Sequence, residues 1–69
     1  MADYVYKQVE LTGTSKTSIE DAVQNAITRA SKTLHNMQWF EILETRGSIE
    51  KGKIGYWQVI MKIGFKLED

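Results

Sequence analysis

A chain of 69 residues that contains no cysteine has few ways to hold a fold together. It cannot form a disulfide or a thiolate metal site, and one histidine, His35, cannot supply an imidazole cluster. A chain of this length hides only about 60% of the surface that its unfolded form exposes, so a single core leaves it marginally stable. Association with further copies of the chain is the remaining source of stability. We therefore expect one small domain, residues 1–69, that forms a homo-oligomer.

The charge balance and the apolar runs exclude several classes of partner. Nine Lys and Arg face nine Asp and Glu, which argues against nucleic acid, because affinity for phosphates comes from clustered basic side chains. The longest apolar runs, such as residues 59–61, are far shorter than the roughly 20 residues that a membrane span needs. The first residues also lack the layout of a signal peptide. We expect a cytoplasmic protein with neither nucleic acid nor a membrane as its partner.

The first half of the chain predicts a strand followed by a helix. Residues 4–11 are rich in β-branched and aromatic types, which favour a strand, and residues 12–15 are expected to form a loop. Thr17 and Glu20 then have the spacing of a capping box that begins a helix. The helix has one narrow, alanine-rich apolar stripe that can lie close to a sheet. The stripe consists of Ile19, Ala22, Val23, Ala26, Ile27, Ala30 and Leu34.

The second half predicts a long β-hairpin, with strands over residues 37–49 and 54–67 and a turn at Lys51 and Gly52. The expected fold is therefore α+β, in the order β-α-β-β, with a three-stranded antiparallel sheet partly wrapped around one α-helix. A two-residue turn also predicts a register. On the face that the helix should cover, it pairs Phe40 with Ile63, Ile42 with Met61, Glu44 with Val59 and Arg46 with Trp57.

The opposite face of this sheet needs a cover that one helix cannot provide. The same register places Trp39 opposite Gly64, Leu43 opposite Ile60 and Thr45 opposite Gln58 on that face. A glycine leaves room beside the indole of Trp39, and Gln58 offers an amide to the edge of a ligand. These residues suit a flat heterocycle and a buried subunit contact equally well, so another copy of the chain, a flat ligand or both should cover this face.

Catalytic chemistry is not indicated by the sequence. His35 is expected at the helix C-terminus, where an imidazolium is favourable. The segment 13–18 lacks the first glycine and the spacing of a phosphate loop, which favours a plain turn. Glu41 is expected to pair with Lys62 across the hairpin. Trp57 is expected at the edge of the core, in contact with Arg46. We therefore expect a protein that is not an enzyme.

The order of short segments along the chain resembles the dodecin family of small flavin-binding proteins, from residue 6 to residue 68 without a gap. The segments that carry the resemblance are KQVELTGTS at 7–15, Ser18, DAVQNA at 21–26, SKTL at 31–34, WFE at 39–41, TRG at 45–47, QV at 58–59 and GFKL at 64–67. No single segment is diagnostic, but together, in this order, they are highly specific.

The resemblance implies twelve protomers that close into a hollow sphere. It also implies that flavins, FMN or riboflavin, are buried in pairs at two-fold axes between symmetry-related tryptophans, here Trp39. Gln58 matches the glutamine that binds the pyrimidine edge of the ring, and Arg46 matches an arginine that bacterial members use for FMN. The implied function is to store or sequester flavin and to quench its photochemistry. A flavin-dependent oxidoreductase and a structural shell without a ligand are the alternatives.

The resemblance also implies a coenzyme A site near three-fold axes, which some bacterial members have. Its matching residues here are Tyr6, Arg29, Lys32 and Lys66. Lys66 stands where members of this kind carry an arginine, so a bidentate contact to phosphate is lost. Trp57 stands where similar relatives often carry a tyrosine.

Overall fold

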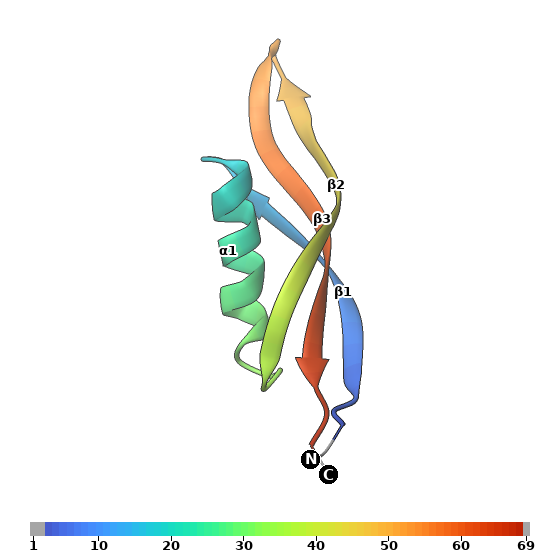
Figure 1. The fold of residues 1–69 in the computed structure, drawn as a ribbon. Helices are drawn as coiled ribbons and strands as arrows, with labels where there is room; N and C mark the ends of the chain where they lie inside the picture. The colour runs from blue at the N-terminus through green and yellow to red at the C-terminus, as the bar shows by residue number, and fades with distance from the viewer. Residues whose placement is uncertain (1–2, 69) are drawn as a thin grey trace.

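The structure, a computed structural model, describes residues 3–68 and contains three strands and one helix in that range. Strand β1 (Tyr6–Ser15) is followed by helix α1 (Ile19–Ala30), and strands β2 (Met37–Glu50) and β3 (Lys53–Lys66) form the hairpin. All pairs are antiparallel, and the strand order β1-β3-β2 places β3 in the centre. Figure 1 shows α1 on one face of the sheet. The predicted α+β fold is confirmed.

The core lies between α1 and the part of the sheet formed by β1 and β3. Val59, Met61 and Ile63 of the central strand are almost completely buried, beneath the small residues of α1. The expectation that the helix also covers the inner face of β2 is wrong. Phe40 and Ile42 share a face with their partners Ile63 and Met61, but their side chains are 49% and 44% exposed. A single helix is too narrow to cover three strands.

Strand β1 and helix α1 differ from the sequence expectation at their ends. Residues 12–15 are not a loop, because they pair with residues 57–60 of β3 and extend β1. The helix is capped by Ser18 rather than Thr17, since the Oγ of Ser18 accepts a hydrogen bond of 3.0 Å from the backbone N–H of Asp21. It ends at Ala30, so His35 lies exposed in the connection to β2 and not at the helix C-terminus.

The hairpin confirms the predicted turn. Lys51 and Gly52 both have positive φ angles, 53° and 77°, as the two central residues of a type I′ turn require. Beyond the last pair of β1, between Ser15 and Trp57, the two strands project from the rest of the fold (Figure 1). Ile49 is 82% exposed on this projection.

The register of the hairpin matches the prediction from Trp39 to Ile42 and again next to the turn, where Ile49 pairs with Ile54 and Glu50 with Lys53. At Leu43 the register shifts by one residue, so that Glu44 lies opposite Ile60 rather than Val59. Such a β-bulge places an extra residue in one strand, so the residues of β2 that follow it change face relative to a regular ladder, up to a second register shift between Gly47 and Ile49. The predicted pairing of Leu43 with Ile60 is therefore wrong, as are the other predicted pairs beyond the bulge: Glu44 with Val59, Thr45 with Gln58, and Arg46 with Trp57.

Candidate functional site

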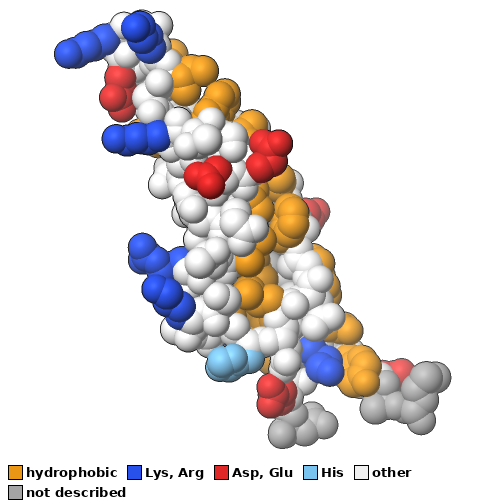
Figure 2. Space-filling model, turned by 90° about the vertical axis from the view of Figure 1, so that its left-hand side faces the viewer, with side chains coloured by type: hydrophobic (Ala, Val, Ile, Leu, Met, Phe, Trp, Pro, Cys, Tyr) orange, Lys and Arg blue, Asp and Glu red, His pale blue; other side chains and the backbone are white. Residues whose placement is uncertain are grey.

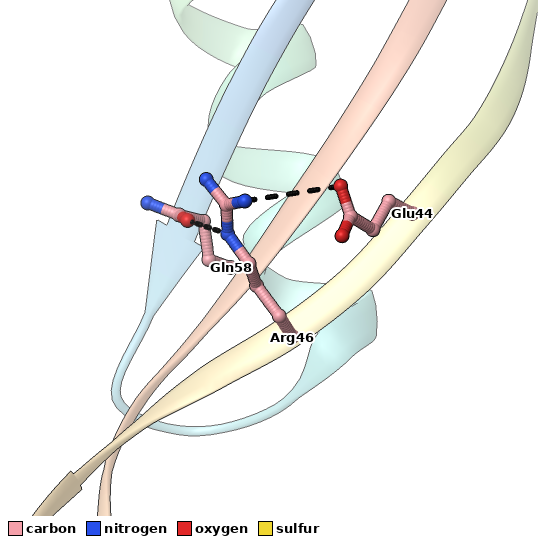
Figure 3. A network of polar contacts seen from close by, with 3 residues as sticks. All are labelled: Glu44, Arg46 and Gln58. Carbon is pink, nitrogen blue, oxygen red and sulfur yellow. Dashed lines mark hydrogen bonds and ion pairs between the residues drawn. The ribbon is translucent and has the colours of Figure 1, made fainter.

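The bulge at Leu43 brings Arg46 to the same face of the sheet as Gln58, its cross-strand partner. Nε of Arg46 donates a hydrogen bond to Oε1 of Gln58. Nη1 of Arg46 lies 3.8 Å from Oε1 of Glu44, which precedes it by two residues in β2. Figure 3 shows the guanidinium between the amide and the carboxylate. Because the guanidinium only donates, it holds the amide oxygen and leaves the amide nitrogen of Gln58 free to donate to a ligand.

Trp39 forms a second group on this face, which we call the outer face of the sheet. Its indole lies over Gly64, where a Cβ atom would come within 2.1 Å of Cε2. The indole extends across the central strand toward β1, and its ring centroid is 5.0 Å from that of Tyr6 at an interplanar angle of 60°. Since the indole is 40% exposed, glycine below it and tyrosine beside it hold an aromatic surface open.

These two groups share the outer face but do not lie side by side. Trp39 is opposite Gly64 and Arg46 is opposite Gln58, so six residues of β3 separate the two positions. At about 3.3 Å per residue, this is a separation of about 20 Å along the strand. The sequence predicted the common face of Trp39 and Gln58 correctly, and the predicted pairing of Trp39 with Gly64 is confirmed.

The four residues implied for coenzyme A divide between two parts of the chain. Tyr6 and Lys66 are cross-strand partners in β1 and β3, and Nζ of Lys66 lies 4.4 Å from the ring centroid of Tyr4. Arg29 lies in the last turn of α1 and lines a groove of about 550 Å³ between α1 and β1. The backbone N–H of Lys32 donates to the carbonyl of Arg29. Within residues 3–68 the structure records no contact between these two pairs.

Sequence reasoning missed two members of the site. Glu44 was assigned to the helix-covered face, because nothing in the local sequence pattern indicates the bulge that places it on the outer face. Tyr6 was assigned only to coenzyme A, although it shares the outer face with Trp39 across the central strand. Strand alternation in β1, combined with the small Gly64, was the available signal for this second contact.

Other candidate chemistry is accounted for by the fold. The Oγ of the buried Ser15 accepts a 2.9 Å hydrogen bond from the backbone N–H of Thr17 and donates to Asp21, so this segment is a strand end followed by a helix cap. In the described part of the chain, no three His, Cys, Asp or Glu side chains are grouped so that they could hold a metal ion. No helix among residues 3–68 has the length and apolarity that crossing a membrane requires.

Comparison with known proteins identifies the family to which this fold belongs. The family model described as Dodecin matches residues 5–68. A curated dodecin from Thermus thermophilus is 48% identical over 65 residues, which cover 94% of each chain. The solved structure of dodecin from Streptomyces davaonensis superposes with a TM-score of 0.95 at 44% identity, covering 99% of this chain and 100% of that one.

A solved structure with lower sequence identity has the same fold. Calcium dodecin from Mycobacterium tuberculosis, described as a calcium chelating antigen with a novel calcium-binding site, is 29% identical. It covers 93% of this chain and 91% of its own, with a TM-score of 0.81. These matches show that the chain belongs to the dodecin family.

Proposed function

We propose that this protein binds a flavin, FMN or riboflavin, on the outer face of its sheet and stores it in a buried, photochemically quiet form. The observation that carries the proposal is the indole of Trp39, which rests on Gly64 and keeps an exposed surface. A tricyclic ring can stack on such a surface, at a gain of roughly 1 to 3 kcal/mol per ring. Membership of the dodecin family supports the same ligand.

The second group on the outer face suits the polar edge and the tail of a flavin. The amide nitrogen of Gln58 is directed away from Arg46 and can donate to a ring carbonyl. The side chain of Arg46 is 53% exposed, so its guanidinium can be reached by the phosphate of FMN as well as by Glu44. A bound flavin supplies the chromophore and the redox-active ring, while the protein stacks, orients and shields it.

Storage is favoured over a flavin-dependent oxidoreductase by the same geometry. Burial in pairs between tryptophans, as the family resemblance implies, would cover both faces of the ring and leave neither for a second substrate, and an indole is an electron donor that quenches an excited flavin. A structural shell without a ligand is the other alternative. Coenzyme A, which the family resemblance implies, would have to reach both faces of the sheet, because Tyr6 and Lys66 are cross-strand partners on the outer face and Arg29 lines the groove between α1 and β1.

Substitution of each tryptophan tests the proposal. Trp39→Ala should leave the assembly intact, while added riboflavin or FMN keeps its fluorescence in solution, because the stacking surface is gone. Trp57→Phe is the matched control: Trp57 is opposite Gly47 on the other face of the sheet, so this variant should still quench. The measurement is a fluorescence titration of each variant after size-exclusion chromatography. If the Trp39 variant quenches flavin fluorescence and the Trp57 variant does not, the proposal has assigned the stacking surface to the wrong tryptophan.

The alternatives are separated by the purified parent protein. A yellow and weakly fluorescent preparation excludes the empty shell, and flavin-dependent turnover of NADH would favour the oxidoreductase. Denaturing extraction followed by mass spectrometry identifies the bound flavin and any coenzyme A that is released with it.

A further inference from the structure

The guanidinium of Arg46 is shared between two partners on the outer face. Its Nε donates to Oε1 of Gln58, and its Nη1 lies 3.8 Å from Oε1 of Glu44. The second separation is that of an ion pair but is longer than a hydrogen bond. Both side chains of the ion pair are more than half exposed, so the carboxylate can close on the guanidinium or turn away from it at little cost. Glu44 is therefore a movable neighbour of Arg46 and not a fixed support.

A phosphate binds a guanidinium best through two parallel N–H groups along one edge of the planar group. The guanidinium of Arg46 has two such edges, one formed by Nε and Nη2 and the other by Nη1 and Nη2. Gln58 occupies Nε and Glu44 faces Nη1, so one donor of each edge is already directed to another group, as Figure 3 shows. Loss of the contact to Gln58 would free the amide that is to bind the ring. The edge that faces Glu44 is therefore the one that a phosphate can take.

The charges around this pair do not favour a second anion. The row of outer-face residues beyond Glu44 consists of Glu10, Lys62 and Glu41, which are paired across the three strands. Over these two rows and Arg46, the carboxylates outnumber the basic side chains. A phosphate ester carries a charge of about −1.5 to −2 at pH 7. It therefore meets a repulsion here that the neutral hydroxyls of a ribityl chain do not meet.

We propose that Glu44 sets the preference between FMN and riboflavin, because its carboxylate competes with the flavin phosphate for the guanidinium of Arg46. This inference rests on the proposed function and assigns the choice of its ligand to one residue. With the carboxylate on the guanidinium, the pair is nearly neutral and suits the hydroxyls of riboflavin. FMN has to displace Glu44 before its phosphate can use the edge between Nη1 and Nη2. Glu44 thereby reduces the advantage that Arg46 gives to FMN.

Titration of the Glu44→Gln variant with both flavins tests the inference. Glutamine keeps the size of the side chain and its capacity for hydrogen bonds, but it cannot compete as an anion. The affinity for FMN should rise by about 3- to 10-fold relative to the affinity for riboflavin, the gain expected from one charge-assisted hydrogen bond on an exposed surface. The readout is the ratio of the two affinities, measured by fluorescence quenching with the assembled protein. An unchanged or lowered ratio overturns the inference.

Two matched controls separate competition for Arg46 from a general effect of charge. Glu41→Gln removes the same charge from the same strand and face, but its partner Lys62 lies four residues of β3 from Gln58, about 13 Å, which is beyond the range of an unscreened exposed charge. This variant should change the ratio by less than about 2-fold. In a protein that already carries Arg46→Met, Glu44→Gln should also change the ratio by less than about 2-fold, because no guanidinium is left to release.

The outcomes distinguish this inference from the proposed function. An equal rise of the ratio in the Glu41 variant, or a full rise without Arg46, overturns the competition and leaves flavin binding in place. Parent protein that quenches neither riboflavin nor FMN overturns both.

Discussion

Gly64 determines whether Trp39 can present its indole. The ring lies over the glycine of the neighbouring strand, in space that any Cβ atom would occupy. A glycine in the middle of a central strand weakens the strand, and its usual reason is the close approach of another group. Here that group is the aromatic surface that the proposed function requires, so the residue that costs strand stability is the one that shapes the site.

We predict that Gly64→Ala displaces the indole and weakens flavin binding by about 5- to 150-fold, the range of one lost stacking interaction. The added methyl group would lie 2.1 Å from Cε2 of Trp39, so the ring must move. The measurement is riboflavin quenching by the assembled variant. Gly55→Ala is the control, since the three atoms nearest to its Cβ belong to the side chains of Glu50 and Ser48, which can move. Unchanged quenching by the Gly64 variant would show that the observed indole position is not required.

Arg46 holds the amide of Gln58 in one orientation, and its removal should lower the affinity for the ligand. We predict that Arg46→Met weakens riboflavin binding by about 2- to 10-fold. Without the guanidinium the amide of Gln58 is mobile, and ordering it on binding costs free energy. The loss is small because the Arg46–Gln58 pair is exposed and partly screened by water. Glu44→Gln should change binding by less than about 2-fold, since the Glu44–Arg46 ion pair is exposed. Titrations of both variants with riboflavin, which carries no phosphate, separate this positioning effect from direct phosphate binding.

At the scale of elements, a compact set of hydrogen bonds holds the start of α1. Ser15, at the end of β1, accepts from the backbone N–H of Thr17 and donates to the carboxylate of Asp21. Ser18 caps the helix through the backbone N–H of Asp21. The last residue of the strand and the first turn of the helix are thereby locked together, and α1 is held close over Gly13, where a Cβ would lie 2.2 Å from the carbonyl oxygen of Ala22.

We predict that Ser18→Ala destabilises the protein by about 1 kcal/mol, the usual cost of a lost N-cap, while Thr17→Ala has little effect. The measurement is thermal unfolding of both variants by circular dichroism at one fixed protein concentration, because the midpoint of an oligomer depends on concentration. A larger loss in the Thr17 variant would mean that the capping box of the sequence analysis, and not the Ser18 cap, forms in solution.

At the scale of the whole molecule, the isolated chain is thin and elongated, with overall dimensions of 56 × 21 × 13 Å. Hydrophobic side chains run along it from the hairpin tip to the opposite end, as Figure 2 shows. The large hydrophobic side chains that are exposed include Phe40 and Ile42, which the helix leaves uncovered, and Ile49 and Ile54 on the projecting hairpin. A two-stranded projection is marginally stable in water, so this surface has the character of an interface between copies.

We predict no appreciable folded monomer at micromolar concentration. Light scattering coupled to size exclusion should give a mass of about twelve times the 7.9 kDa of one chain, the dodecamer that we propose from the family resemblance. A charge placed in the middle of the apolar surface, Ile42→Glu, should shift the elution toward smaller species. A monodisperse and folded parent monomer would contradict the proposed assembly.

The sequence by itself determined the order of the four elements, the turn at Lys51 and Gly52, and the common face of Trp39 and Gln58. These features rest on local physical chemistry: the period of two in strands, the period of 3.6 in helices, and the positive φ angles of a tight hairpin turn. The family resemblance added Arg46 to the site, although the register predicted from the turn placed that residue on the wrong face.

Only the tertiary structure decided the bulge at Leu43, the helix cap at Ser18 and the part of the sheet that α1 covers. Each of these depends on which distant residues pair and pack together, and one extra residue in a strand reverses every face that follows it. Alternation alone assigns Trp39 and Gln58 to one surface, and the pairing of Trp39 with Gly64 separates them by about 20 Å along β3. A periodic pattern records the side of the sheet that a residue occupies, whereas its distance from another residue depends on the register and on the position along the strand.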